Sequence, residues 1–337
     1  MINKDKKKST ENTEGTESLA VSKLPTVLIA YHANCIDGFT SAWVIAKAMK
    51  ERGLNFTLFP MSYTEEDYAA LWAELEAEPT SYTELYVVDF SLPVCLLADL
   101  QDKMCQVTVV ILDHHKTAFE AYGLAQRERT IITSYLGATI VLASKLSGAS
   151  LCWEYFNGRK PVPKLIAHVQ DWDLWQFQYG DKTRALHYIL QEELQCLEVW
   201  DRYAKELEIS DTYNYIMLRG SKLLTKRKLR VTDLAIDARL TPIAGYEVLA
   251  AQCQEPELTS ELGDYLAKDR MPREFAAVYR IDTKASLVHW SLRSVGDFDV
   301  SVIAKLFGGG GHRNAAGFVK EITPLQPAPK APQTSKP

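Results

Sequence analysis

The stretch "VVILDHHKTA", Val109 to Ala118, decides the fold. It begins as a run of apolar, mostly β-branched residues and ends in Asp113, His114 and His115. A short apolar run of this kind is typical of a strand buried in a sheet. A carboxylate and two imidazoles placed directly after it are costly to bury unless they are paired or bind a cation. The stretch therefore predicts a buried strand with a polar site at its carboxyl end.

The sequence around this stretch alternates between expected strands and helices. Strands are expected at 26–32, 55–61, 84–90 and 107–115, and helices at 39–53, 65–78 and 93–104. Gly53 closes the first helix, where a left-handed residue commonly ends a helix. The alternation predicts an α/β fold with a parallel sheet that helices cover on both faces. Such sheets carry their binding sites at the carboxyl ends of the strands.

The second half of the sequence predicts a helical segment and then a smaller α/β domain. Helices are expected at 138–147, 163–175, 193–207, 213–230 and 299–307, and strands at 246–253, 274–282 and 285–294. We expect a first domain over 24–195, a helical connector over 196–232 and a second domain over 233–322. The polar residues 1–23 and the Pro-rich residues 323–337 are expected to be disordered tails.

The composition is that of an ordinary globular protein, with 47% hydrophobic and 24% charged residues. The net charge of −5 means that a polyanion must be held by a local basic patch or by metal. The six cysteines form no CxxC pair, which argues against a zinc knuckle and fits a reducing compartment. No apolar run reaches the roughly 18 residues of a membrane span. We therefore expect a cytoplasmic protein without a membrane partner.

Polar residues follow several of the expected strands. The candidates are His32, Asn34, Cys35 and Asp37 after the first strand, Asp89 after the third, Asp113, His114 and His115 after the fourth, and Asp171 and Asp173 on a later helix. Each has an ordinary structural interpretation: a helix cap for Asp113 or Asp173, a core residue for a histidine, a small buried apolar group for Cys35. Three strand ends that deliver such residues to one sheet edge favour a metal site, and the excess of carboxylates favours Mn²⁺ or Mg²⁺.

These residues carry a family resemblance. "HANCIDG", "VVDF", "LDHH" and "HVQDWD" resemble, in order, the four motifs of the DHH phosphoesterase superfamily. "SLRS" and "DVSVIAKLFGGGGHRNAAGF" resemble its partner domain, DHHA1. The resemblance covers about residues 26 to 320, and the layout is similar to that of bacterial nanoRNases, or oligoribonucleases, and of 3′,5′-bisphosphate nucleotidases.

The resemblance implies two divalent cations, with Mn²⁺ expected and Mg²⁺ as the alternative. It implies that Asp89 bridges them, that His32 binds one, and that the other is held by Asp37, His114 and Asp171. It further implies that Asp113 orients a histidine and that His115 faces the phosphate, so that these two act in catalysis.

One position departs from the family pattern, because Cys35 stands where the family usually has an aspartate. Either Cys35 is a soft ligand, or the first metal has fewer protein ligands and more water. A thiolate would shift the preference towards Zn²⁺ or Fe²⁺.

The second domain is expected to hold the substrate. The glycine run from Gly308 through Gly309 and Gly310 to Gly311 would let backbone N–H groups approach an anion, with His312 beside it. Arg293 would offer a fork for a terminal phosphate. A flexible loop, for the glycines, and the polar face of an ordinary strand, for Arg293, are the structural alternatives.

The sequence thus predicts a metal-dependent phosphoesterase acting on short single-stranded oligonucleotides or nucleotides. The alternatives are a pyrophosphatase or polyphosphatase, and a non-catalytic nucleotide-binding module. Whether the protein is a homodimer is left open. The basic segment 219–230 is interpreted as a solvated connector helix or as a rim for a nucleic-acid backbone.

Overall fold

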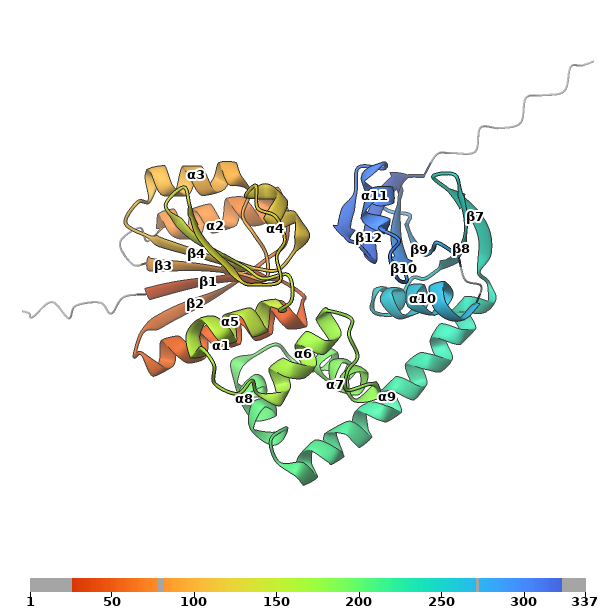
Figure 1. The fold of residues 1–337 in the computed structure, drawn as a ribbon, viewed down its shortest axis with the longest axis horizontal. Helices are drawn as coiled ribbons and strands as arrows, with labels where there is room; N and C mark the ends of the chain where they lie inside the picture. The colour runs from red at the N-terminus through yellow and green to blue at the C-terminus, as the bar shows by residue number, and fades with distance from the viewer. Residues whose placement is uncertain (1–25, 78–81, 271–272, 323–337) are drawn as a thin grey trace, which may run out of the picture.

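The chain folds into two lobes, each built around a six-stranded sheet (Figure 1). The computed structural model describes residues 26–77, 82–270 and 273–322. The expected tails, 1–23 and 323–337, lie outside the described residues. The predicted α/β class, with a parallel sheet followed by a second α/β unit, is confirmed. None of the described helices combines the length and the apolar character that crossing a membrane requires.

The sheet of the first lobe is parallel except at one edge. Its strand order is β2-β1-β3-β4-β6-β5, and only β5 runs antiparallel to its neighbour. Pro60 lies in β2, an edge strand, where a missing N–H breaks no central ladder. The strands are β1 Thr26–His32, β2 Asn55–Met61, β3 Tyr82–Val88, β4 Thr108–Asp113, β5 Ile131–Tyr135 and β6 Ala138–Leu142.

Helices cover both faces of this sheet, so its strands are apolar on both sides. In β1, Val27 and Ile29 pack into one core, and Leu28 and Ala30 pack into the other. One face is covered by α1 Ile36–Glu51, α5 Gly148–Asn157, α6 Lys164–Asp173, α7 Asp181–Glu192 and α8 Leu197–Glu206. The opposite face is covered by α2 Glu65–Ala77, α3 Val94–Lys103 and α4 Lys116–Ala121. In the central strands β1 and β4, the charged or ionisable site residues His32 and Asp113 are accordingly the last residues of their strands.

One expected helix is wrong. Residues 138–147 form strand β6 and the turn that leads into α5, and β6 pairs with β5 in a hairpin. The hairpin turns at Leu136 and Gly137, both with positive φ. The run from Thr139 to Val141 is β-branched, and Ile140 and Val141 are buried, which suits the inside of a sheet better than a helix.

The two lobes are joined by one long helix, α9 Ser210–Ile236 (Figure 1). The expected connector, 196–232, ends inside it. Gly220 lets α9 approach α7 closely, because a Cβ there would lie 2.4 Å from the carbonyl oxygen of Ala185. Further along, Arg227 donates to Gln191 Oε1 of α7 at 2.7 Å and to the carbonyl oxygen of Glu257 at 3.0 Å. The helix is thus bonded to both lobes.

The sheet of the second lobe has the order β11-β12-β10-β9-β8-β7, with only β8 and β9 parallel. The end of α9 and α10 Thr259–Tyr265 pack on one face, and α11 Val300–Lys305 packs on the other. The predicted central strands are confirmed, whereas β7, β11, β12 and α10 were not predicted. The strands are β7 Arg239–Ile243, β8 Tyr246–Gln252, β9 Phe275–Asp282, β10 Leu287–Ser294, β11 Gly310–His312 and β12 Ala315–Glu321, and the short helices are η1 Pro256–Leu258 and η2 Leu266–Arg270.

Candidate metal centre

Three adjacent strands deliver polar side chains to one edge of the first sheet. β1 ends at His32, Asp89 follows β3, and β4 ends at Asp113 with His114 and His115 behind it. Since β1, β3 and β4 are parallel neighbours, their carboxyl ends lie side by side. Asp37 comes from the first turn of α1, which begins directly after β1.

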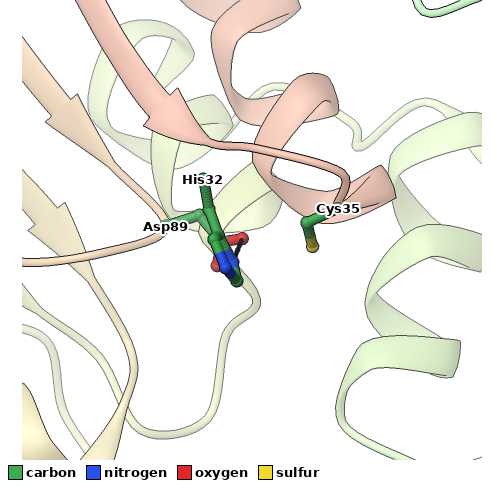
Figure 2. Close-up of side chains that lie close together, drawn as sticks. All are labelled: His32, Cys35 and Asp89. Atoms are coloured by element: carbon green, nitrogen blue, oxygen red, sulfur yellow. Dashed lines mark ion pairs between the residues drawn. The ribbon is translucent and has the colours of Figure 1, made fainter. Parts of the chain in front are cut away.

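The side chains meet around His114. Its Nε2 lies 3.1 Å from Asp89 Oδ1, 3.5 Å from Asp173 Oδ2 and 4.0 Å from Asp37 Oδ2. On the other side of Asp89, its Oδ2 lies 3.6 Å from His32 Nδ1. Figure 2 shows His32 and Asp89 facing each other, with the Cys35 side chain beside them at the start of α1.

The donor atoms of this cluster fall into three groups, and within each group they lie within 4.8 Å of one another. The groups are His32–Cys35–Asp89, Asp89–His114–His115 and Asp37–His114–Asp173. Asp89 belongs to two of them, which is the geometry that a bridging ligand needs. Carboxylates and imidazoles together suit first-row divalent cations.

Three buried polar atoms of the cluster have no hydrogen-bond partner: His32 Nδ1, Asp89 Oδ2 and Asp173 Oδ2. Buried polar atoms are rarely left unpaired, because each one costs about 1–3 kcal/mol. Two of these three atoms are carboxylate oxygens, and a carboxylate oxygen has no proton to donate to its neighbours. The residues therefore fit a bound cation.

The electrostatics point the same way. Burial and the neighbouring Asp89 and Asp173 raise the pKa of Asp37 well above its usual value. Burial lowers the pKa of His114, but the carboxylates of Asp173 and Asp89 outweigh it and raise that pKa to about 10. Without metal the cluster thus concentrates negative charge and draws a proton onto His114. A divalent cation would supply the missing positive charge.

Asp113 has a different role from the other carboxylates. Its Oδ1 accepts from the backbone N–H of His114 at 2.7 Å and lies 2.7 Å from His115 Nδ1, while its Oδ2 accepts from Ser91 Oγ at 2.6 Å. Its oxygens are therefore occupied within the protein. The resemblance implies that Asp113 orients a histidine, and its contact with His115 Nδ1 is compatible with that prediction.

The structure does not bring Asp171 to the cluster. Its Oδ1 accepts from the backbone N–H of Gln178 at 2.7 Å, and its Oδ2 accepts from the N–H of Tyr179 at 3.1 Å and from the hydroxyl of Thr183 at 2.5 Å. The carboxylate thus holds the turn between α6 and α7. The structure therefore does not support Asp171 as a ligand, and Asp173, a candidate whose structural alternative is a helix cap, lies at the cluster instead.

Gly148 is a further residue of the site that the sequence did not reveal. Its backbone N–H donates to Asp37 Oδ2 at 2.6 Å, and the N–H of Ala149 donates to Asp37 Oδ1 at 3.1 Å. A Cβ on Gly148 would lie 2.8 Å from Asp89 Cβ and 2.9 Å from Asp37 Oδ2. The glycine therefore lets the start of α5 sit directly against both carboxylates. The sequence "LSGAS" carries no signal that would have shown this.

The backbone at Asp89 is unusual. Its φ is +60°, in the left-handed region that residues other than glycine and asparagine rarely occupy. Such a conformation is disfavoured by roughly 1–3 kcal/mol and is often found at functional sites. Here it directs the carboxylate back towards His114 and His32.

The second lobe reaches the cluster through His312. Its ring centroid lies 5.0 Å from that of His115 and 6.2 Å from that of His114. Burial, with the nearby His115 and His114, lowers the pKa of His312 to about 4, so it is neutral near pH 7. An ion pair between Lys116 and Asp299, with Nζ and Oδ2 3.6 Å apart, also joins the lobes.

A cleft of about 570 Å³ lies between the lobes at this point. His114 and Asp173 line it from the first lobe, and Arg293 and His312 line it from the second. Arg293 donates from Nη2 to Ser260 Oγ at 2.9 Å and from Nη1 to the carbonyl oxygen of its neighbour Leu292. The remaining basic and aromatic side chains that line the cleft are Lys116, Lys268, Arg313, Trp172 and Trp175.

The glycine run differs in part from the expectation. The N–H of Gly308 donates to the carbonyl oxygen of Lys305, and that of Gly309 donates to the carbonyl oxygen of Ala304. The structure therefore contradicts the prediction of Gly309 as an anion-binding residue, because its N–H already donates to a carbonyl oxygen at the end of α11. Gly310 and Gly311 lie in strand β11, which pairs with β12.

The basic segment 219–230 supports the connector interpretation. Arg227 donates to Gln191, Lys228 Nζ lies 2.9 Å from Asp181 Oδ2, and Arg230 forms three hydrogen bonds to the Glu255 carboxylate. The exposed residues Arg219, Lys222 and Lys226 make up the rest of the basic set.

No family model matches the chain. Two curated proteins are similar to it in sequence. Uncharacterized protein R106 of Acanthamoeba polyphaga mimivirus is 30% identical over 298 residues, which cover 86% of this chain and 66% of that protein. The oligoribonuclease NrnB of Bacillus subtilis (strain 168) is 24% identical over 231 residues, which cover 62% of this chain and 52% of that protein. The chain therefore spans less than two thirds of the length of either relative.

Two solved structures share the fold across both lobes. RecJ from Thermus thermophilus, in complex with Mn²⁺, superposes with a TM-score of 0.50 at 13% identity, covering 88% of this chain and 49% of RecJ. An exopolyphosphatase-related protein from Bacteroides fragilis superposes with a TM-score of 0.51 at 15% identity, covering 87% of this chain and 86% of that one.

The chain has the fold of these two proteins. In this chain, the "LDHH" segment is the end of β4 and the two residues after it, in the middle of the sheet. The DHH motif itself therefore supplies Asp113, His114 and His115 to the cluster described above.

Proposed function

We propose that this chain is a metal-dependent phosphoesterase that hydrolyses short oligonucleotides or nucleotides. The observation that carries the proposal is the cluster of buried carboxylates and imidazoles, with three unpartnered polar atoms, beside a cleft lined by basic and aromatic side chains. The DHH fold, shared with a Mn²⁺-bound RecJ, and the match to an oligoribonuclease support the same class of chemistry.

The cluster offers ligands for two divalent ions that share Asp89. The first position would take His32 and Asp89, with Cys35 beside them, and the second would take Asp89, His114, Asp37 and Asp173. Bound there, such ions would lower the pKa of a water molecule and neutralise charge on the phosphoryl oxygens.

His115 would handle a proton in this proposal. Asp113 accepts the Nδ1–H of His115, which leaves Nε2 as the atom available to a substrate. Burial lowers the pKa of His115, but the Asp113 carboxylate outweighs it and raises that pKa above the usual value. A protonated Nε2 can donate to a phosphoryl or leaving-group oxygen.

The interlobe cleft favours a nucleotide over a bare polyphosphate. Arg293 gives it positive charge from the second lobe, whereas Lys268 Nζ is paired with Asp264 Oδ1 at 2.7 Å in the same cleft. Trp172 and Trp175, with ring centroids 5.0 Å apart, line the same cleft. An aromatic face can stack on any base, which contributes roughly 1–3 kcal/mol per base. Pyrophosphate could use the charges but not the rings.

A substrate panel tests the proposal. Di- to decanucleotides of RNA and DNA, a cyclic dinucleotide, adenosine 3′,5′-bisphosphate, pyrophosphate and polyphosphate are assayed with Mn²⁺ and with Mg²⁺. Asp89→Asn is the control variant, and it should remove the activity that depends on metal. We expect turnover of the nucleotide substrates. Turnover of polyphosphate alone would move the protein to the polyphosphatase alternative, and nucleotide binding without turnover would make it a binding module.

A further inference from the structure

The first metal position differs chemically from the other two groups because it contains a sulfur atom. Cys35 Sγ lies within 4.8 Å of the ligand atoms of His32 and Asp89 (Figure 2). The groups around His114 contain only carboxylates and imidazoles. One DHH centre thus holds two ligand sets of different softness.

The thiol stands next to atoms that lack partners. His32 Nδ1 and Asp89 Oδ2 are both buried without a hydrogen bond, and Asp89 is only 1% exposed. Cys35 precedes α1 as its N-cap residue, yet its side chain makes no capping hydrogen bond. The sulfur is therefore not needed to close the helix, and it lies beside an imidazole nitrogen and a carboxylate oxygen that are not satisfied by the protein.

The backbone holds this arrangement in place. Gly38, in the first turn of α1, lets the helix begin against His32, because a Cβ on Gly38 would lie 2.3 Å from the carbonyl oxygen of His32. The four-residue segment from His32 to Cys35 is short, with Asn34 in a left-handed conformation at φ +55°. Sulfur and imidazole are thus brought to the same side of Asp89.

The spacing suits a small ion with thiolate, imidazole and carboxylate ligands. Zn²⁺ takes such ligands at about 2.0–2.3 Å in tetrahedral geometry, which separates ligand atoms by about 3.5 Å. The His32 Nδ1 to Asp89 Oδ2 distance is 3.6 Å. Three protein ligands would leave a fourth position for water or substrate, as in catalytic zinc sites. Mg²⁺ has little affinity for sulfur and prefers oxygen ligands.

We propose that His32, Cys35 and Asp89 form a thiolate site that selects a borderline d-block ion such as Zn²⁺, Co²⁺ or Fe²⁺ over Mg²⁺. The inference rests on the proposed metal-dependent function, and it assigns the two positions of the centre to different ions. The carboxylate-rich position around His114 remains suited to Mn²⁺ or Mg²⁺.

Cobalt spectroscopy tests the site without any turnover. The full chain is stripped of metal with a chelator and titrated with CoCl₂, and the near-ultraviolet thiolate-to-cobalt charge-transfer band is recorded together with the visible d–d bands. We expect the charge-transfer band in the wild-type protein. It should be displaced by Zn²⁺ and should persist in excess Mg²⁺.

Cys196 provides a matched control. It is also half-buried, it is the N-cap of α8 without a side-chain capping bond, and it belongs to none of the candidate metal groups of the described residues. The band should remain in Cys196→Ser and disappear in Cys35→Ser and Cys35→Asp. Cys35→Asp should still show d–d bands, with the Zn²⁺-to-Mn²⁺ affinity ratio shifted towards Mn²⁺.

A measurement on the wild-type protein alone covers the case in which a Cys35 variant does not fold. Alkylation of Cys35 by iodoacetamide, read by mass spectrometry, should be blocked by Zn²⁺ and not by Mg²⁺. A band that survives in Cys35→Ser, Co²⁺ binding without a charge-transfer band, absence of Co²⁺ binding, or equal alkylation with both ions would each overturn the proposal.

The two proposals fail separately. A charge-transfer band in a protein that hydrolyses no substrate of the panel would refute the phosphoesterase proposal and support the thiolate site. Hydrolysis of a nucleotide substrate by a protein that shows no charge-transfer band would support the phosphoesterase proposal and refute the thiolate site.

Discussion

Asp171 and Asp173 lie two residues apart on α6, and the same change, aspartate to asparagine, should affect them in opposite ways. The Asp171 carboxylate accepts hydrogen bonds from the turn that follows α6, including the N–H of Gln178 at 2.7 Å. An amide replaces one acceptor oxygen with a donor that faces another donor. Hydrogen bonds to charged groups contribute about 1.5–3 kcal/mol each. Asp171→Asn should therefore lower the free energy of unfolding by about 2–3 kcal/mol, with or without metal.

Asp173→Asn should leave the metal-free protein almost as stable as wild type. Asp173 Oδ2 has no hydrogen-bond partner to lose, and its ion pair with His114 Nε2 is long, at 3.5 Å. Burial raises the pKa of this carboxyl even though His114 opposes the shift, so its ionised form is disfavoured without metal. We expect a change in unfolding free energy below about 1 kcal/mol, as for substitutions that break no buried bond.

The difference appears when metal is added. An ion at a hundred times its dissociation constant stabilises the folded protein by about 2.7 kcal/mol. Loss of a residue outside the coordination sphere already weakens metal binding by up to about 100-fold, and loss of a ligand should do at least as much. At the same concentration, the ion would then stabilise Asp173→Asn by only about 0.4 kcal/mol.

The assay is urea unfolding followed by circular dichroism, with chelator and with Mn²⁺, for the wild type and both variants. The expected pattern is a stability loss without a metal effect for Asp171→Asn, and a loss of the metal effect without a stability loss for Asp173→Asn. The reverse pattern would refute the assignment of Asp173 to the metal centre.

Three further predictions concern other parts of the chain. Gly148→Ala should abolish metal binding, measured by calorimetry, because the added Cβ would come within 3 Å of the Asp37 and Asp89 carboxylates. The control variant Ser150→Ala, in the same helix, should bind metal normally. Equal metal binding by both variants would show that the close approach of Gly148 to the carboxylates is not needed. Burial lowers the pKa of His168 from 6.5 to about 4. The contribution of the neutral histidine to the free energy of unfolding is therefore complete above pH 6.5 and is lost, by up to about 3 kcal/mol, as the pH falls towards 4. His168→Gln should flatten the slope of unfolding free energy against pH in this range, and an unchanged slope would contradict the assignment. Arg293→Ala should lower kcat/KM for a dinucleotide by on the order of 10²-fold and lower it much less for bis-p-nitrophenyl phosphate, because a charge-assisted bond to the remote part of the substrate contributes about 1.5–3 kcal/mol. Equal losses on both substrates would mean that Arg293 acts at the metal centre or in folding.

The strand-end cluster could be predicted because a local pattern and a general rule were enough. The apolar runs before His32, Asp89 and Asp113 identified the strands, and parallel neighbours bring their carboxyl ends together. No packing detail was needed for that step.

The choice between Asp171 and Asp173 could not be made from the sequence. On a helix, residues two positions apart point about 200° away from each other, so only one of the two can face the cluster. Which one does depends on how α6 is rotated against α5 and α7, and this is set by tertiary packing. The sequence "DWD" is compatible with either rotation of α6 about its axis.

Two local errors have a similar origin. A run of about five apolar residues is compatible with a buried strand and with a buried helix, so the sequence predicts a helix over 138–147 where the structure has strand β6. In the second lobe, the sequence does not predict strand β11, because Gly310 and Gly311 lie in it and glycine is depleted in strands and typical of loops. The pairing of β11 with β12 supplies what the local preference lacks.

The left-handed backbone of Asp89 places this position under two opposing demands. Selection for folding alone would favour glycine or asparagine there, since both adopt this conformation readily. A screen for thermostable variants should therefore recover Asp89→Asn and Asp89→Gly early, and these survivors would be well folded but unable to bind metal normally. Substitutions of Asp89 should therefore raise thermal stability while weakening metal binding. A stability–activity trade-off in this protein can be observed directly at this residue.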